Sequence, residues 1–265
     1  MTWLETKKDQ VAMEGSAHEK SKIIVTTDVN GTTTPHNTFA ELVRSDGLFD
    51  QMKILMKAYT SGTATFSAVL PKMKRLTQGV DRLRVESYAR NMPLHKGVKE
   101  TFDALMRARN IDAKLALSTT GFAGLMALVN KHRHGSLFGV AASPVLVHLL
   151  NSDEKACLIR AVTDEKDKIR VIDDLATLHR PNKQLIFHIG DTMGDFFAIK
   201  HAAQRGGVGI AFNPNKELEI NISRLPKSLK PGIREIAFRT DEEPDYCRVL
   251  DMIKEVVWER LRLEL

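Results

Sequence analysis

The stretch that decides the fold is Ile23-Ile24-Val25-Thr26-Thr27-Asp28-Val29-Asn30-Gly31-Thr32. Its first five residues are all β-branched, which is typical of a short strand buried in a parallel sheet. Asp28 follows directly, and the next residues are predicted to form a loop because they include Gly31 and Pro35. The pattern therefore predicts a buried strand that ends in a carboxylate and a glycine-containing loop.

Further strands are predicted along the chain, and helical patterns separate them. The strands are expected at residues 113–118, 138–142, 185–189 and 207–212, and the helices at 98–109, 122–131, 146–163, 168–179, 194–204 and 244–265. This alternation predicts an α/β fold, a doubly wound, Rossmann-like parallel sheet with helices on both faces. In such sheets the ligand lies at the carboxyl ends of the strands.

A helical module interrupts this alternation after the first strand. Residues 39–91 show apolar side chains at helical spacing, with breaks near Gly47, Gly62 and Gly79. We expect this module to be a small helical domain, and residues 21–38 and 92–265 to form the α/β core. Residues 1–20 are polar and are expected to be a disordered or frayed tail.

The composition is that of a soluble globular protein. The chain has 265 residues, of which 43% are hydrophobic and 27% charged. No stretch approaches the length of apolar sequence that a transmembrane helix needs, so no membrane association is expected. Two cysteines, Cys157 and Cys247, cannot build a disulfide framework, and no secretory h-region is visible. These features predict a cytoplasmic location.

The charge is concentrated in the helical module. The chain has 39 basic and 33 acidic residues, a formal net charge of +6, and between Lys53 and Arg90 only Asp81 and Glu86 oppose the basic side chains. This segment is either a solvated helical face or a surface that attracts a small anionic substrate. Nucleic acid is a weaker interpretation, because aromatic residues are few there and no recognition motif is present.

Three histidines have ordinary structural interpretations. His132 and His134 flank Arg133 and are predicted to lie on the surface. His188 falls within the strand at 185–189, so it is expected to be a core histidine rather than a ligand.

Polar side chains follow three predicted strands at the same edge of the sheet. They are Asp28, Thr119 and Asp191, and Asp195 comes shortly after the last of them. Carboxylates that converge repel one another unless a cation joins them, and hard oxygen ligands favour Mg²⁺. Lys168 opens a helix and can supply a fixed positive charge. Each residue alone is ordinary, but together they suit phosphoryl transfer, which depends on positioning and charge neutralisation.

These residues carry a resemblance to a known family. Asp28-Val29-Asn30-Gly31-Thr32 resembles the first motif of the haloacid dehalogenase superfamily, in which phosphatases have Asp-x-Asp-Gly-Thr. Residues 115–122 resemble its second motif, Lys168 suits its third, and Gly190-Asp191-Thr192-Met193-Gly194-Asp195 resembles its acidic fourth. The strand and loop that follow, residues 209–214, are similar to the phosphoserine phosphatase-like branch.

The resemblance implies a role for each matched residue. Asp28 would be the nucleophile that forms an aspartyl-phosphate. Mg²⁺ would be held by Asp28, the backbone carbonyl of Asn30 and Asp191, with Asp195 orienting that site. The phosphoryl oxygens would be bound by Thr119 and Lys168. Further phosphate-binding residues would come from the first motif, Gly31 and Thr32, and from the second, Thr120 and Gly121.

The resemblance also implies a cap. The interval between Asp28 and Thr119 is long enough for a helical insertion, whereas the interval between Thr119 and Lys168 is too short for a second large one. Residues 39–91 would then be a cap that closes over the site and excludes water.

The chain departs from the family pattern at residue 30. Family phosphatases use an aspartate there as general acid and base, but asparagine cannot exchange a proton at neutral pH. Asn30 is then native, with slow turnover or with substrates such as acyl phosphates, or another group such as His36 replaces the acid, or the asparagine is an introduced change. Asn37 and Met73 also occupy positions where the phosphoserine phosphatase branch has its substrate-binding residues.

The leading hypothesis is therefore a Mg²⁺-dependent phosphatase of a small phosphorylated metabolite. One alternative is phosphonate hydrolysis in the same superfamily, which requires a cap lysine, Lys53 or Lys57, to form a Schiff base. Another is a catalytically impaired homologue that binds an anionic ligand. The sequence leaves the substrate and the oligomeric state open.

Overall fold

The computed structural model describes residues 21–143, 158–178 and 184–265. The predicted N-terminal tail and most of the helix predicted at residues 146–163 lie outside this range. Among the described residues, no helix combines the length and the apolar character needed to cross a bilayer.

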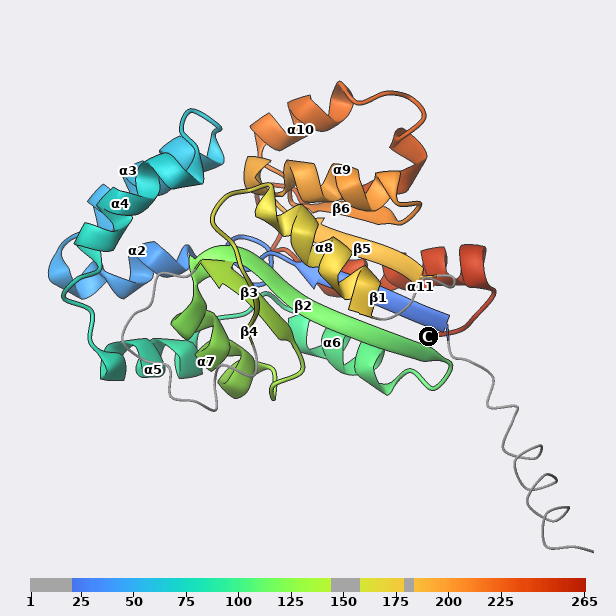
Figure 1. The fold of residues 1–265 in the computed structure, drawn as a ribbon, viewed down its shortest axis with the longest axis horizontal. Coiled ribbons are helices and arrows are strands. Elements are labelled where there is room, and N and C mark those ends of the chain that lie inside the picture. Colours follow the sequence, from blue (N-terminus) through green and yellow to red (C-terminus); the bar gives the residue numbers. More distant parts are fainter. Residues whose placement is uncertain (1–20, 144–157, 179–183) are drawn as a thin grey trace, which may run out of the picture.

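The core is a parallel sheet whose seven described strands have the order β4-β3-β2-β1-β5-β6-β7 (Figure 1). The strands are β1 (Ser21–Thr27), β2 (Ile111–Phe122), β3 (Gly139–Ser143), β4 (Leu158–Ala161), β5 (Gln184–Gly190), β6 (Val208–Phe212) and β7 (Ile233–Ile236). Val25 of β1 pairs with Leu115 of β2 on one side and with Phe187 of β5 on the other. The strand order reverses beside β1, which is where ligands bind in sheets of this kind.

All five predicted strands are present, and two were not predicted. The helix predicted at 146–163 is wrong for its last residues, because Leu158–Ala161 form β4 and pair in parallel with β3. The short strand β7 escaped prediction because it is only four residues long. Strand β2 also continues past Ser118, with a shift in its pairing to β3 between Ser118 and Phe122. Residues 119–121, which follow the predicted strand, thus belong to its irregular end.

Helices cover both faces of the sheet (Figure 1). On one face, α6 (Val98–Arg107), α7 (Ala123–Arg133) and α11 (Cys247–Leu261) pack against the side chains of Ile23 and Val25. On the other face, α8 (Asp167–Leu178) and α9 (Phe196–Gln204) pack against Ile24. The alternation of β1 side chains between two cores confirms that this strand is buried on both sides, as its unbroken β-branched run predicts. A further helix, α10 (Lys216–Ser223), follows β6.

The helical insertion after β1 contains α2 (Thr38–Leu42), α3 (Phe49–Thr60), α4 (Phe66–Leu76) and α5 (Arg82–Asn91), with a 3₁₀ turn at Arg44–Asp46. Its apolar positions form the inner faces that the sequence predicts, for example Met52 and Met56 on α3 and Met73 on α4, all buried. Thr65 and Asp81 cap the first turns of α4 and α5. In Figure 1 the insertion lies beyond the carboxyl ends of the strands.

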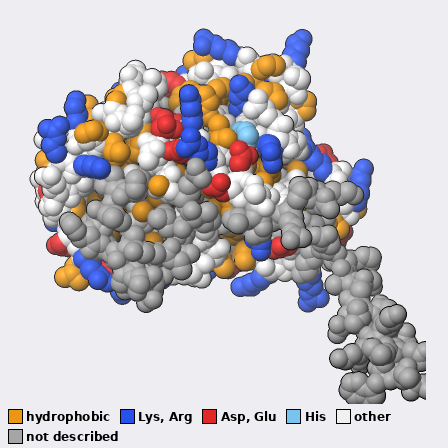
Figure 2. Space-filling model, viewed as in Figure 1, with side chains coloured by type: hydrophobic (Ala, Val, Ile, Leu, Met, Phe, Trp, Pro, Cys, Tyr) orange, Lys and Arg blue, Asp and Glu red, His pale blue; other side chains and the backbone are white. Residues whose placement is uncertain are grey.

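Lys and Arg side chains are scattered over the visible face, some at its rim and some nearer its middle (Figure 2). Within the insertion, Lys53 and Lys57 are exposed, as is Arg82. On the visible face, this arrangement fits a solvated basic surface better than a single concentrated patch.

Candidate functional site

The site begins where β1 ends. The backbone N–H of Asp28 donates to the Ile189 carbonyl at 2.9 Å, which joins the ends of β1 and β5. The loop that follows is tight, since the N–H groups of residues 32–34 all donate to the carbonyl of Val29. The Gly31 N–H also donates within the loop, to the Thr34 carbonyl at 2.8 Å. The amides of Gly31 and Thr32, predicted to bind phosphate, are therefore engaged inside the loop.

A buried lysine links two carboxylates at this edge of the sheet. Lys168 Nζ lies 3.0 Å from Asp28 Oδ1 and 2.6 Å from Asp195 Oδ1. Asp28 directly follows β1, Lys168 lies at the start of α8, and Asp195 ends the 3₁₀ turn Met193–Asp195 after β5. The structure thus brings together, at the carboxyl ends of the strands, three residues that are far apart in the chain.

Asp191 completes the group from the opposite side. Its Oδ1 accepts a hydrogen bond from the Thr32 hydroxyl at 2.8 Å. A Cβ atom at residue 31 would overlap with the Asp191 carboxylate, and Gly31 has φ +84°, so both space and backbone conformation require glycine here. The glycine lets the first loop approach Asp191 closely.

Burial and mutual repulsion govern the charges of this group. Burial and the nearby Asp195 and Asp28 carboxylates raise the pKa of Asp191 well above its usual value. Burial also raises the pKa of Asp28, against the opposing influence of Lys168. Burial alone would raise the pKa of Asp195 too, but Lys168 and His188 outweigh it and lower that pKa to about 2. One lysine therefore does not compensate all three carboxylates.

The carboxylates provide a donor set that fits a hard metal ion. One oxygen from each of Asp28, Asp191 and Asp195 lies within 4.8 Å of the others. Oxygen ligands from carboxylates are the type that Mg²⁺ uses in proteins. Both oxygens of Asp195 are engaged by the protein, Oδ1 by Lys168 and His188 and Oδ2 by the N–H groups of residues 191 and 192. Asp28 and Asp191 are therefore the better candidates to bind the cation directly.

His188 is buried within β5, as predicted, and it also contacts this site, which the sequence interpretation did not foresee. Its Nε2 lies 3.3 Å from Asp195 Oδ1, and its Nδ1 lies 2.8 Å from the hydroxyl oxygen of Thr26, its pairing partner on β1. A neutral ring with its proton on Nε2 donates to Asp195 and accepts from Thr26. Burial lowers the pKa of His188, which favours this neutral form. The only available signal was a polar residue in an otherwise apolar strand, three positions before Asp191.

The second predicted motif contributes unequally. Thr119 lies close enough to Asp28 for its hydroxyl to lower the pKa of that carboxyl. Thr120 lines the cavity above Asp28. The Gly121 N–H donates to Thr119 Oγ1 at 3.2 Å, which fixes that side chain, and Gly121 itself is buried.

Asn30 is held by the first turn of the insertion. Its Oδ1 accepts from the N–H of Thr38, at the start of α2, at 2.8 Å. The residue is partly exposed and lines the same cavity as Asp28.

A cavity of about 300 Å³ opens above these residues, between the core and the insertion. It is lined by Asp28, Asn30, Gly31, Pro35, His36, Asn37, Met56, Tyr59, Thr60, Thr120, Lys168, Asp191, Thr192 and Asn215. Sequence reasoning missed the contributions of Met56, Tyr59 and Thr60, because helical periodicity marks them only as apolar or neutral positions. It also missed Asn215, whose Nδ2 donates to the Thr60 carbonyl at 3.1 Å.

Tyr59 lies where the insertion meets the core. Its side chain is buried, and a Cβ at Gly194 would collide with its hydroxyl oxygen. Burial raises the pKa of Tyr59, so the phenol is neutral. A second contact lies nearby, where the Phe66 N–H at the start of α4 donates to Glu165 Oε1 at 3.1 Å.

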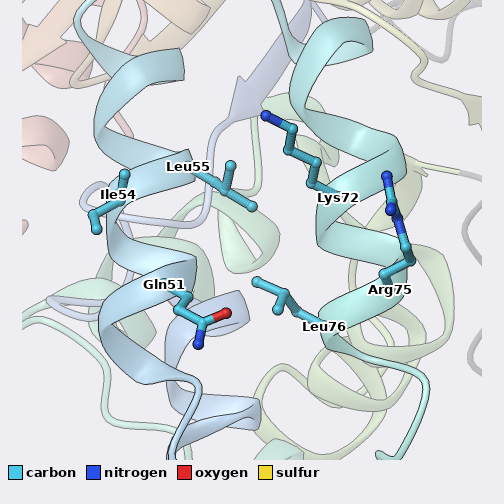
Figure 3. Close-up of a pocket in the computed structure, with 6 residues that line it drawn as sticks. All are labelled: Gln51, Ile54, Leu55, Lys72, Arg75 and Leu76. Carbon is cyan, nitrogen blue, oxygen red and sulfur yellow. The ribbon is translucent and has the colours of Figure 1, made fainter.

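A larger groove of about 500 Å³ lies on the outer side of the insertion, between α3 and α4 (Figure 3). It is lined by Gln51, Ile54, Leu55, Lys72, Arg75 and Leu76. It contains no carboxylate and none of the residues predicted to carry chemistry, so the cavity above Asp28 is the candidate site.

The fold has clear relatives among solved structures. A substrate-bound phosphoserine phosphatase complex superposes with a TM-score of 0.65 at 20% identity, covering 88% of this chain and 99% of the other. A phospho-aspartyl intermediate analogue of phosphoserine phosphatase gives 0.63 at 20% identity, with the same coverage. A family hydrolase from Salmonella enterica serovar Typhi gives 0.59 at 14% identity, covering 90% of this chain and 78% of the other.

The chain has the fold of the haloacid dehalogenase superfamily, in its phosphoserine phosphatase-like form. No protein-family model matches the sequence, and no curated protein matches it either. The fold that the motifs implied is therefore confirmed by these structures, and no overall sequence similarity adds to it.

Proposed function

We propose that this protein is a Mg²⁺-dependent phosphatase that hydrolyses a small phosphorylated metabolite through an aspartyl-phosphate on Asp28. The observation that carries the proposal is the position of Lys168 Nζ, 3.0 Å from Asp28 Oδ1 and 2.6 Å from Asp195 Oδ1. This contact leaves Asp28 Oδ2 as the oxygen available for attack.

The charge balance supports the cofactor. With all three carboxylates ionised, Asp28, Asp191 and Asp195 exceed the charge of Lys168 by two, and these four side chains are buried or nearly so. Uncompensated buried charge is costly, so a divalent cation suits the group. Mg²⁺ bound beside Asp28 and Asp191, with the Asn30 carbonyl, would neutralise the phosphoryl oxygens and orient them for attack.

The remaining steps belong to the protein's own side chains. Asp28 Oδ2 attacks phosphorus, and the bond from phosphorus to the leaving group breaks with its electron pair on the leaving group. Lys168 and Thr119 favour the ionised form of Asp28, and Lys168 also lines the cavity, where it can bind a phosphoryl oxygen. Water then attacks the aspartyl-phosphate, which releases inorganic phosphate and restores the Asp28 carboxylate.

We assign the helical insertion, residues 39–91, as a cap over this site. Met56, Tyr59 and Thr60 line the same cavity as Asp28. Two hydrogen bonds support a closed position, from Asn215 to the Thr60 carbonyl and from the Phe66 N–H to Glu165. Closure would exclude water from the phosphoryl group.

The substrate is proposed to be small and anionic, because the cavity has about 300 Å³ and the phosphoryl group must reach Lys168. The insertion's basic surface would favour the approach of such an anion. A cytoplasmic location remains a prediction, as does the absence of nucleic-acid and membrane partners.

No observation favours the phosphonate alternative. Lys53 and Lys57 are exposed, and neither is among the residues that line the cavity. The Lys53 ammonium instead lies 5.4 Å from the centre of the Phe49 ring. The alternative of an impaired binding homologue is addressed by the turnover experiment.

The test is phosphate release from a panel of phosphorylated metabolites, including acyl phosphates, with Mg²⁺ or with EDTA. We expect turnover with Mg²⁺, loss of turnover with EDTA, and a drop of at least 10³-fold in Asp28→Asn, of the order seen when a covalent nucleophile is removed. Asp50→Asn, an exposed aspartate on α3, is the matched control and should retain activity. Full Mg²⁺-dependent activity in Asp28→Asn would refute the proposal.

A further inference from the structure

The carboxamide of Asn30 has a fixed orientation. Its Oδ1 accepts from the Thr38 N–H at 2.8 Å, so its Nδ2 is the end left for other partners. Because Asn30 lines the cavity with Asp28, the group it can offer there is an N–H donor. A carboxamide donates hydrogen bonds but does not release a proton at neutral pH.

Asn37 repeats this arrangement beside Asn30. Its Oδ1 accepts from the N–H of Ala40, the third residue of α2, at 3.1 Å. Asn37 also lines the same cavity. The two carboxamides therefore both direct their oxygens to α2. Their NH₂ groups have no protein partner among the described residues.

Few other groups in the cavity lining could supply a proton. Lys168 already donates to Asp28 and Asp195, and Asp191 accepts from Thr32. The Tyr59 hydroxyl lies against Gly194. Among the described lining residues this leaves His36, which is exposed at the rim.

We propose that the site acts on phosphoryl groups carried by leaving groups that depart as stable anions, such as acyl phosphates, and that Asn30 stabilises the departing oxygen by a hydrogen bond. The inference rests on the proposed function of Asp28. The bond between phosphorus and the acyl oxygen breaks with its electron pair on that oxygen, and the product is a carboxylate that needs no proton. Phosphates of ordinary alcohols are poor substrates, because an alkoxide must be protonated as it leaves.

The same geometry affects the second half of the reaction. Water attacks the aspartyl-phosphate and must lose a proton, and Asn30 cannot accept it. The aspartyl-phosphate therefore breaks down more slowly than it forms, and it accumulates. With an aryl phosphate whose phenolate leaves readily, the first turnover appears as a burst of phenolate equal to the enzyme concentration.

The experiment measures kcat/KM in Mg²⁺ for a series of aryl phosphates whose phenols span a wide range of pKa, together with acetyl phosphate and glycerol phosphate. We expect a steep dependence on leaving-group pKa for the unmodified chain. Asn30→Asp should flatten it and raise the rate for the poorest leaving groups by about 10²–10⁴-fold, the usual contribution of a general acid. The gain should be smallest with acetyl phosphate, whose leaving carboxylate needs no proton.

Two further variants test the alternatives. In His36→Gln, kcat/KM should depend on leaving-group pKa as steeply as in the unmodified chain. If the dependence is shallow in the unmodified chain and steep in His36→Gln, His36 is the general acid and the proposal is wrong. Thr38→Pro removes the N–H that holds Asn30 Oδ1 and fits the first helical position, since Asn37 before it is extended at φ −79° and ψ 110°. We expect it to lower kcat/KM several-fold for aryl phosphates relative to Thr38→Ala, which keeps the N–H.

The proposed function and the inference about the leaving group can be refuted separately. If Asp28→Asn retains full turnover, the proposed function is wrong. If Asp28 is required but the unmodified chain hydrolyses glycerol phosphate as fast as acetyl phosphate, with a shallow dependence and no burst, only the inference about the leaving group is wrong.

Discussion

Lys168 and Asp195 form a 2.6 Å ion pair in which the lysine side chain is 2% exposed and the aspartate fully buried. Asp195 is fixed further by His188 and by the N–H groups of residues 191 and 192, so it serves as an anchor for the lysine. The lysine is thereby held against Asp28, on which the chemistry depends. This relationship explains why a buried lysine is tolerated in the core.

Replacing Lys168 should leave the repulsion among the buried carboxylates of the site uncompensated. We expect Lys168→Met to lower the free energy of unfolding by about 3–5 kcal/mol in EDTA, the usual result when one partner of a buried ion pair is removed. Added Mg²⁺ should recover part of this loss, because a cation bound to the native state stabilises it. Urea unfolding in EDTA and in Mg²⁺ measures both effects.

The control for this variant is Lys227→Met, at an exposed lysine in the connection after α10. It should change the unfolding free energy by no more than about 0.5 kcal/mol. If Lys168→Met were equally mild, the ion-pair account of the site would be untenable.

Variants at two glycines distinguish the cost of backbone strain from the cost of a steric clash in the site. Gly31 and Gly47 have φ of +84° and +71°, but a Cβ at Gly31 overlaps with Asp191, whereas one at Gly47 has no atom within 4 Å. Gly47→Ala should therefore cost only about 1–2 kcal/mol, the price of a left-handed alanine. Gly31→Ala should cost more and should also abolish stabilisation by Mg²⁺, since Asp191 must move.

Thermal unfolding with and without Mg²⁺ distinguishes the two glycine variants. Equal losses, with the Mg²⁺ response intact in both, would mean that the close approach of the loop to Asp191 has no role in metal binding.

The contact between Gly194 and Tyr59 should control how the insertion meets the core. Gly194→Ala places a methyl group against the Tyr59 hydroxyl oxygen, and overpacking of this kind costs about 1–3 kcal/mol. We expect a higher KM in Gly194→Ala and partial recovery in the double variant Gly194→Ala/Tyr59→Phe, which removes that oxygen. No recovery in steady-state kinetics of the double variant would show that the two residues do not interact.

His134 should make stability depend on pH. It is buried between Phe102 and Phe138, contrary to its predicted surface position, and burial lowers its pKa from 6.5 to about 4. The unfolded chain binds a proton near pH 6.5 and the native state does not, so stability is complete above pH 6.5. It falls as the pH drops toward 4, by about 3 kcal/mol in all.

The variant His134→Phe keeps the aromatic packing and removes the proton site. Urea unfolding between pH 8 and 4 should show the unmodified chain losing more stability than the variant, since the other titrating groups are common to both. Parallel profiles would mean that the unfolded and native chains bind this proton equally.

Much of the fold could be predicted because its strands are short, apolar and regularly separated by helices. Strand β4 could not, because residues 158–161 become a strand through pairing with β3, a contact that is remote from any local pattern. His134 was misplaced for a similar reason, since its burial depends on Phe102 of α6 and on Phe138, just before β3, which no local pattern reveals.

The acidic part of the site could be predicted because aspartates at strand ends must converge in a parallel sheet. The orientation of Asn30 could not, since it depends on the N–H of Thr38 at the start of the insertion. His188 and Tyr59 likewise acquire their place only from tertiary packing, against Asp195 and Gly194.

The most direct test of the account is to find where the phosphoryl group is bound during turnover. The protein is mixed with ³²P-labelled acetyl phosphate and Mg²⁺, quenched in acid, and the labelled peptide is identified. The account predicts acid-stable, hydroxylamine-sensitive label on Asp28, and none in Asp28→Asn. Label on another residue, or turnover without any phosphorylated protein, would contradict it.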